Sequence, residues 1–220
     1  MIDARRISRQ RALVGAGAAV LLGVLLGAFS SLGDRIHVMV VNGLANAAAP
    51  WIVIAFVAGA LQRSAMGGAI AGAAALVTGV VTYYGGFVAG GYAYLLPFLA
   101  AWSLVAAGSG ALFGLAGGMR ADDPGRWRVG AVVLVAGALL AEAAYRLILL
   151  EVWTGIEWDR TYMQVAVADT VAAVVLLLVL VERRRWLSAF AILLPVAAAG
   201  LIVFLAAEKM FRWVSGLAFT

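Results

Sequence analysis

The chain has 220 residues, of which 65% are hydrophobic and 12% are charged, and its net charge is +5. A soluble domain is apolar over roughly half of its residues, so this composition excludes one and indicates an integral membrane protein. The sequence contains no cysteine and one histidine, which excludes disulfides, thiolate nucleophiles and a conventional zinc site. The basic residues lie mostly at the ends of apolar runs, a pattern typical of membrane topology and not of nucleic-acid binding.

Seven apolar runs predict an all-α fold, a polytopic transmembrane helix bundle that forms a single integral membrane domain over residues 1–220. The runs cover residues 12–30, 50–62, 67–86, 94–117, 129–150, 163–181 and 187–207. Crossing a hydrocarbon core takes about 20 residues, so the run 50–62 is short for a span. We therefore expect about seven spans, with a range of six to seven.

The first run carries small residues at every fourth position: Gly15, Ala19, Gly23 and Gly27. Such a ladder forms a flat helix face on which another helix packs at close range. The second helix is either part of this chain or belongs to a partner subunit or a second copy. The arginines before residue 12 would also suit a cleaved signal sequence, but the run is long enough to span, so we favour a retained helix.

The stretch 31–49 is less apolar and includes Asp34, Arg35, His37, Asn42 and Asn46. We expect an outer loop there, with a short interfacial helix over residues 36–48 and with His37 exposed. Entry of this stretch into the bilayer is the alternative, and it would change the parity of the crossings.

Hydrophilic loops are predicted at residues 118–128 and 151–162. Of the 16 Lys and Arg residues, eleven fall in segments that would face the cytoplasm and four in segments that would face outward, while Arg146 lies within a span. The positive-inside rule then predicts that the N-terminus is inside and the C-terminus outside, in a multi-pass protein of the plasma membrane.

Three ionisable residues fall within the predicted spans. Glu142 and Arg146 are one helical turn apart, in the order that favours an ion pair. Asp169 lies on the next span, and all three are about 6 to 12 Å below the predicted outer ends. A charge at the centre of a membrane helix costs about 2.5 to 3.5 kcal/mol, so these side chains should face the protein interior and pair. We predict that Arg146 bridges Glu142 and Asp169; a purely structural ion network is the alternative.

Aromatic residues gather at the same predicted depth. Ligand sites combine apolar walls with a few convergent polar groups, so we predict an outer-facing pocket. Its predicted ligand-binding residues are Glu142, Arg146, Asp169, Tyr83, Tyr84, Trp102 and Tyr145. Taken singly, the aromatic residues also fit an interfacial belt. No nucleophile or set of metal ligands accompanies the two carboxylates, so we expect no catalytic residues, metal, cofactor or enzyme activity.

With Asn46, Pro50-Trp51, the sequence Ala-Phe-Val-Ala-Gly at 55–59 and Tyr83-Tyr84, the chain resembles a family of small, uncharacterised integral membrane proteins of high-GC Gram-positive bacteria. That family has no assigned activity to carry over. Size, helix count and the ladder of small residues also resemble the substrate-binding S components of energy-coupling-factor vitamin transporters, although these usually have six spans. That likeness implies a coupling partner docked on the first helix and a solute bound from outside.

These features predict a component that binds or transports a small solute. The alternative is a non-catalytic structural or accessory membrane protein. The expected partners are the lipid bilayer and a subunit or second copy on the first helix, without nucleic acid.

Overall fold

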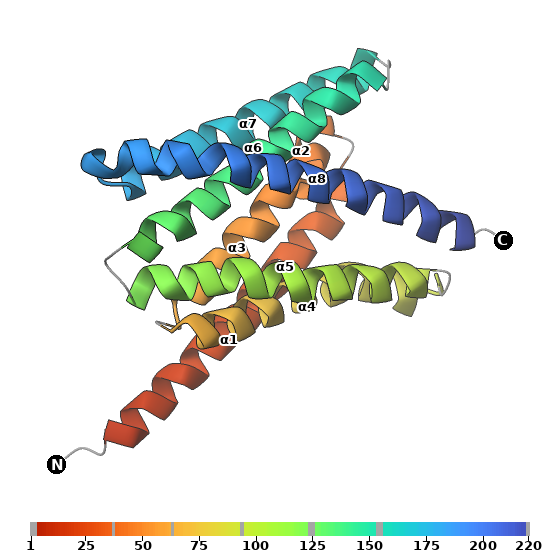
Figure 1. Cartoon of the computed structure of the whole chain (residues 1–220). Coiled ribbons are helices and arrows are strands. Elements are labelled where there is room, and N and C mark those ends of the chain that lie inside the picture. Colours follow the sequence, from red (N-terminus) through yellow and green to blue (C-terminus); the bar gives the residue numbers. More distant parts are fainter. Residues whose placement is uncertain are drawn as a thin grey trace.

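The computed structural model describes residues 4–36, 38–62, 64–92, 95–122, 126–152 and 156–218, and these ranges contain helices and no strand. The predicted all-α bundle is therefore confirmed (Figure 1). The helices are α1 (Ala4–Arg35), α2 (Met39–Ala45), α3 (Ala48–Ala60), α4 (Ala65–Ala89), α5 (Leu96–Asp122), α6 (Arg126–Val152), α7 (Ile156–Leu180), the short 3-10 helix η2 (Arg183–Arg185) and α8 (Trp186–Ala218).

Six of the described helices, α1 and α4 to α8, are long and apolar enough to cross a membrane. The predicted run 50–62 instead forms α3, which has 13 residues and is about 20 Å long. Helix α3 is too short to span the membrane alone. Helix α2 lies directly before it, separated by a break at Asn46 and Ala47. The two together form a discontinuous helix.

Helix directions follow from the closest backbone approaches. A Cβ added to Gly23 would lie 2.2 Å from the carbonyl oxygen of Ala75, and one added to Gly27 would lie 2.2 Å from that of Gly79. Contacts that advance together along both helices make α1 and α4 parallel. The chain must therefore return between Arg35 and Ala65, so the discontinuous helix runs opposite to both.

The small-residue face of α1 is covered from within the chain. Ala19 is fully buried in a cluster with Ala58 of α3 and with Ala71 and Ala75 of α4. Gly15 lies against the Gln62 side chain. Close packing replaces the hydrophobic effect as the force that joins helices in lipid, and these small residues permit it. The face that could have received a partner subunit is thus occupied by α3, Gln62 and α4.

Helices α6, α7 and α8 form the other side of the bundle (Figure 1). A Cβ on Gly137 of α6 would lie 2.5 Å from Val196, and one on Gly200 of α8 would lie 2.8 Å from Ala141, so these two helices are parallel. Helix α6 is the most buried of the six long helices, whereas 11% of the best apolar window of α8 is buried. Helix α6 therefore joins the two sides, and α8 is peripheral.

Several predicted boundaries were wrong. The predicted loop 151–162 is largely helical, because α6 ends at Val152 and α7 begins at Ile156. Helix α8 continues to Ala218, beyond the predicted end at 207. Helix α2 is shorter than the predicted interfacial helix and packs into the bundle, with Gly43 against Thr161 and Val165 of α7. The predicted boundaries were placed where the apolar runs of the sequence end, but the helices continue into the polar residues beyond those runs. His37 lies outside the described residues.

Candidate functional site

Glu142 caps the N-terminus of α3. Its side chain is buried, with 1% of the residue exposed. Glu142 Oε1 accepts the backbone N–H of Ala48 at 2.7 Å, and Oε2 accepts that of Ala49 at 2.8 Å. Ala47, the residue that precedes α3, has no side chain that could cap the helix. The first N–H groups of a helix lack partners and carry partial positive charge, so the carboxylate satisfies both requirements.

Arg146 balances the charge of this cap. Its guanidinium donates to Glu142 Oε1 from Nε at 3.2 Å and from an Nη at 2.7 Å, and 12% of its side chain is exposed. The Tyr162 ring of α7 lies against it, with 5.8 Å from Cζ to the ring centroid. Glu142 and Arg146, which the sequence places one helical turn apart, therefore form a buried ion pair that contacts α3 and α7.

Asp169 is the third charge, on α7. It is 2% exposed, and the charges on Glu142 and Arg146 both act on it. No ion pair joins Asp169 to Arg146 in the described part of the chain, where Arg146 donates to Glu142 instead, so the predicted bridge does not form. Asp169 Oδ2 is buried and accepts no hydrogen bond from the described residues. A buried carboxyl oxygen is thus left without a hydrogen-bond partner in the part of the chain that the structure describes.

A second polar cluster, missed in the sequence, surrounds Asp34 at the end of α1. Asp34 Oδ1 accepts the side-chain amides of Asn42 at 3.1 Å and Asn46 at 2.6 Å, and Tyr83 of α4 donates its hydroxyl to Oδ2. Asn42 and Asn46 are four residues apart, which places them on one face of a helical turn. That spacing was the available signal, but the stretch was interpreted as an outer loop.

The predicted aromatic residues lie in separate places. Tyr83 binds Asp34, and Tyr84 meets the Tyr83 ring edge to face with centroids 4.6 Å apart. Trp102 packs against the apolar core. Tyr145 turns toward α8, where its hydroxyl donates to Glu208 at 2.7 Å. Of the seven predicted ligand-binding residues, the structure brings together Glu142, Arg146 and Asp169.

The break between α2 and α3 is held from both sides. Asn46 binds Asp34 of α1, and two residues later Ala48 binds Glu142 of α6. Ser30 adds a hydrogen bond of 2.8 Å to the Ala45 carbonyl. The discontinuous helix is therefore fixed to α1 on one side of its break and to α6 on the other.

A family model matches residues 6–210, which is most of the chain. The chain belongs to DUF6518, a family of unknown function. Neither a curated protein nor a solved structure is matched. The likeness to S components gains no support from these comparisons, and DUF6518 has no assigned activity.

The chemistry available at this site of the DUF6518 chain is electrostatic. Glu142 and Asp169 contribute two negative charges when ionised and Arg146 one positive charge, so the site has a deficit of one cation. Among the described residues, no three His, Cys, Asp or Glu residues gather closely enough to hold a metal ion. A proton or a bound group with one positive charge would neutralise an ionised Asp169.

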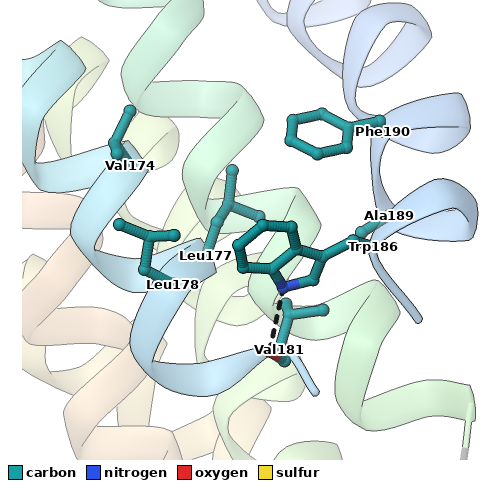
Figure 2. A pocket seen from close by; sticks show the side chains of 7 residues that line it. All are labelled: Val174, Leu177, Leu178, Val181, Trp186, Ala189 and Phe190. Atoms are coloured by element: carbon teal, nitrogen blue, oxygen red, sulfur yellow. Dashed lines mark hydrogen bonds between the residues drawn. The ribbon is translucent and has the colours of Figure 1, made fainter. Parts of the chain in front are cut away.

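The same DUF6518 chain has an apolar groove of about 80 Å³ at the far end of α7. Figure 2 shows Trp186 and Phe190 of α8 facing Val174, Leu177 and Leu178 of α7. The Trp186 indole donates to the Val181 carbonyl at 3.2 Å, which fixes the ring in the groove. No polar side chain lines it, so the groove suits hydrocarbon.

Proposed function

We propose that this protein is a plasma-membrane component that binds or transports a small solute, and that Asp169 receives a positively charged group of that solute. The supporting observation is the buried Oδ2 of Asp169, which has no partner among the described residues. Isolated charge is very costly in an apolar medium, and ionisable residues inside membrane bundles commonly mark solute or ion pathways. A bound cation would compensate the charge of Asp169.

In this proposal Glu142 and Arg146 position the site, but they do not bind the positively charged group of the ligand. Glu142 accepts two backbone and two guanidinium hydrogen bonds, so its oxygens are already engaged. In this proposal the pair fixes α6 against α3, while Asp169 on the neighbouring α7 remains available. The charge on the ligand is therefore specified by Asp169.

Access in this proposal comes from the end of the bundle that holds α2. Gly43 of α2 packs on Thr161 and Val165, and Val165 lies one helical turn before Asp169. Displacement of this short helix would open a path along α7. The excess of arginine and lysine at the opposite end supports an outward-facing entrance.

The test uses the purified full chain in lipid nanodiscs. Native mass spectrometry searches for retained small molecules, and thermal unfolding is followed with a panel of amines and alkali cations at constant ionic strength. A ligand at one hundred times its Kd stabilises by about 2.7 kcal/mol. We expect at least one cation to raise the melting temperature of the wild type and of Glu182→Gln, an exposed control, but not of Asp169→Asn. No stabilisation by any cation, or equal stabilisation of Asp169→Asn, would contradict the proposal.

The alternative is a non-catalytic accessory membrane protein, and the saturated contacts of Glu142 favour it. Two of its four hydrogen bonds cap α3 and the other two pair it with Arg146, which is a complete structural role. In that case Asp169→Asn would stabilise the protein, because it removes an uncompensated charge, and no ligand would be retained by the wild type.

A further inference from the structure

We propose that the groove between α7 and α8 binds one anionic phospholipid of the surrounding bilayer, with an acyl chain in the groove and the phosphate at the arginines of η2. This site is separate from Asp169. It combines two features that lie next to each other at the turn between α7 and α8: the apolar groove and a basic cluster.

The apolar half is an open groove that a segment of a lipid chain can lie along. From Val174 to Val181 the α7 side of the groove extends about 10 Å along the helix. Trp186, Ala189 and Phe190 form the opposite wall (Figure 2). The groove is too short to seat a membrane-spanning helix, which needs a contact face along most of the bilayer. A flexible hydrocarbon chain fits both its length and its apolar lining.

The basic half begins where the groove ends. Val181 lines the groove, and Arg183, Arg184 and Arg185 follow within four residues. The Arg184 side chain is 75% exposed while its Nε donates to Glu182 at 2.7 Å. This hydrogen bond and the charge of Arg184 lower the pKa of Glu182, and Arg128 of α6 acts on Glu182 in the same direction.

The charges near this turn do not cancel. Glu182 offsets one of the three arginines of η2, and Arg128 adds a further positive charge from α6. The start of α8 contributes the positive end of a long helix dipole to the same place. Anionic headgroups are attracted by basic residues at the membrane surface, whereas the cationic group of a zwitterionic headgroup would be repelled. The cluster therefore favours an anionic lipid.

Trp186 gives a direct readout of the lipid chain in the groove. The full-length protein is placed in nanodiscs in which a small fraction of the lipid has brominated acyl chains, which quench tryptophan at contact. The brominated lipid is either phosphatidylglycerol or phosphatidylcholine. Because the chain has seven tryptophans, the Trp186 component is the difference between wild type and Trp186→Phe. We expect phosphatidylglycerol to quench that component at a lower mole fraction than phosphatidylcholine.

Charge variants that keep Trp186 test the headgroup contact. Each arginine near an anionic surface contributes about a fivefold preference, so Arg183→Gln, Arg184→Gln and Arg185→Gln together should reduce the lipid preference by at least that factor. Arg160→Gln removes one exposed arginine at the other end of α7 and should leave the preference unchanged. Equal quenching of the wild type by the two lipids, or the same loss in Arg160→Gln, would overturn the proposal.

Discussion

Glu142 Oε1 accepts the backbone N–H of Ala48 at 2.7 Å, although the two residues are 94 positions apart in the chain. Helix N-termini are usually capped by a side chain of the preceding residue. Here the preceding residue is alanine, and α6 supplies the cap from across the bundle. The position of α3 consequently depends on α6, and Arg146 makes a buried carboxylate tolerable at that place.

We predict that Arg146→Ala strongly destabilises the protein. Removal of one partner of a buried ion pair typically costs about 3 to 5 kcal/mol, because the other charge stays buried without compensation. Equilibrium unfolding in detergent micelles measures this loss. The combination Arg146→Ala, Glu142→Gln and Asp169→Asn should recover part of the stability, since it removes the charges that Arg146 balances. Unchanged stability of Arg146→Ala would show that the pair contributes nothing.

The long helices and the Glu142–Arg146 pair could be predicted because both are encoded locally. Hydropathy over some 20 residues identifies a membrane helix, and a spacing of four residues places two side chains on one face. Asp169 was expected near this pair because α6 and α7 are joined by a short connection and must run antiparallel, and the charges on Glu142 and Arg146 do act on it, although the predicted bridge to Arg146 is not formed.

The interruption between α2 and α3 could not be predicted, since the groups that stabilise it come from elsewhere in the chain. Asp34 binds Asn46 on one side, and Glu142 binds Ala48 on the other. Residues 38–47 are mainly apolar, and Asn42, Gly43 and Asn46 do not by themselves show where the helix breaks or what holds the break. The sequence also could not predict that the aromatic residues lie in separate places, because a shared depth in the bilayer does not determine toward which neighbouring helix each ring points.

Gly23 should not tolerate even one added methyl group. A Cβ there would lie 2.2 Å from the Ala75 carbonyl oxygen, which belongs to the backbone of α4 and cannot move aside. Overpacking of this kind costs about 1 to 3 kcal/mol, and Gly23→Leu should cost more. Gly17 lies on the same helix with nothing within 4 Å of an added Cβ, so Gly17→Ala is the control. Thermal unfolding should show a loss for Gly23→Ala and none for Gly17→Ala; equal behaviour would contradict the close packing of α1 on α4.

Tyr83→Phe should loosen the end of α1 from α4. The substitution removes the hydroxyl that donates to Asp34 and keeps the ring that packs on Tyr84 and Phe87. Loss of one donor to a partly buried carboxylate costs about 1 to 3 kcal/mol. Tyr84→Phe is the matched control, since Tyr84 contributes its ring and not a donor to Asp34. Hydrogen exchange should rise in α2 for Tyr83→Phe only, and a rise in both variants would assign the effect to ring packing.

The discontinuous helix should cross the membrane as a seventh pass. Helices α1 and α4 are parallel, and Arg35 Cζ lies 5.8 Å from the centre of the Phe87 ring, so the C-terminal ends of the two helices lie on the same side.

The chain contains no native cysteine, which permits labelling of single introduced cysteines with a membrane-impermeant maleimide in intact cells. Val38→Cys and Gly90→Cys should react from the same side and Leu61→Cys from the opposite side. The charge bias further predicts that the first two react from outside. Ala58→Cys, at a fully buried position, should react after denaturation alone. Reaction of Leu61→Cys together with Val38→Cys would mean that α2 and α3 turn back within the bilayer, and the count of seven passes would be wrong.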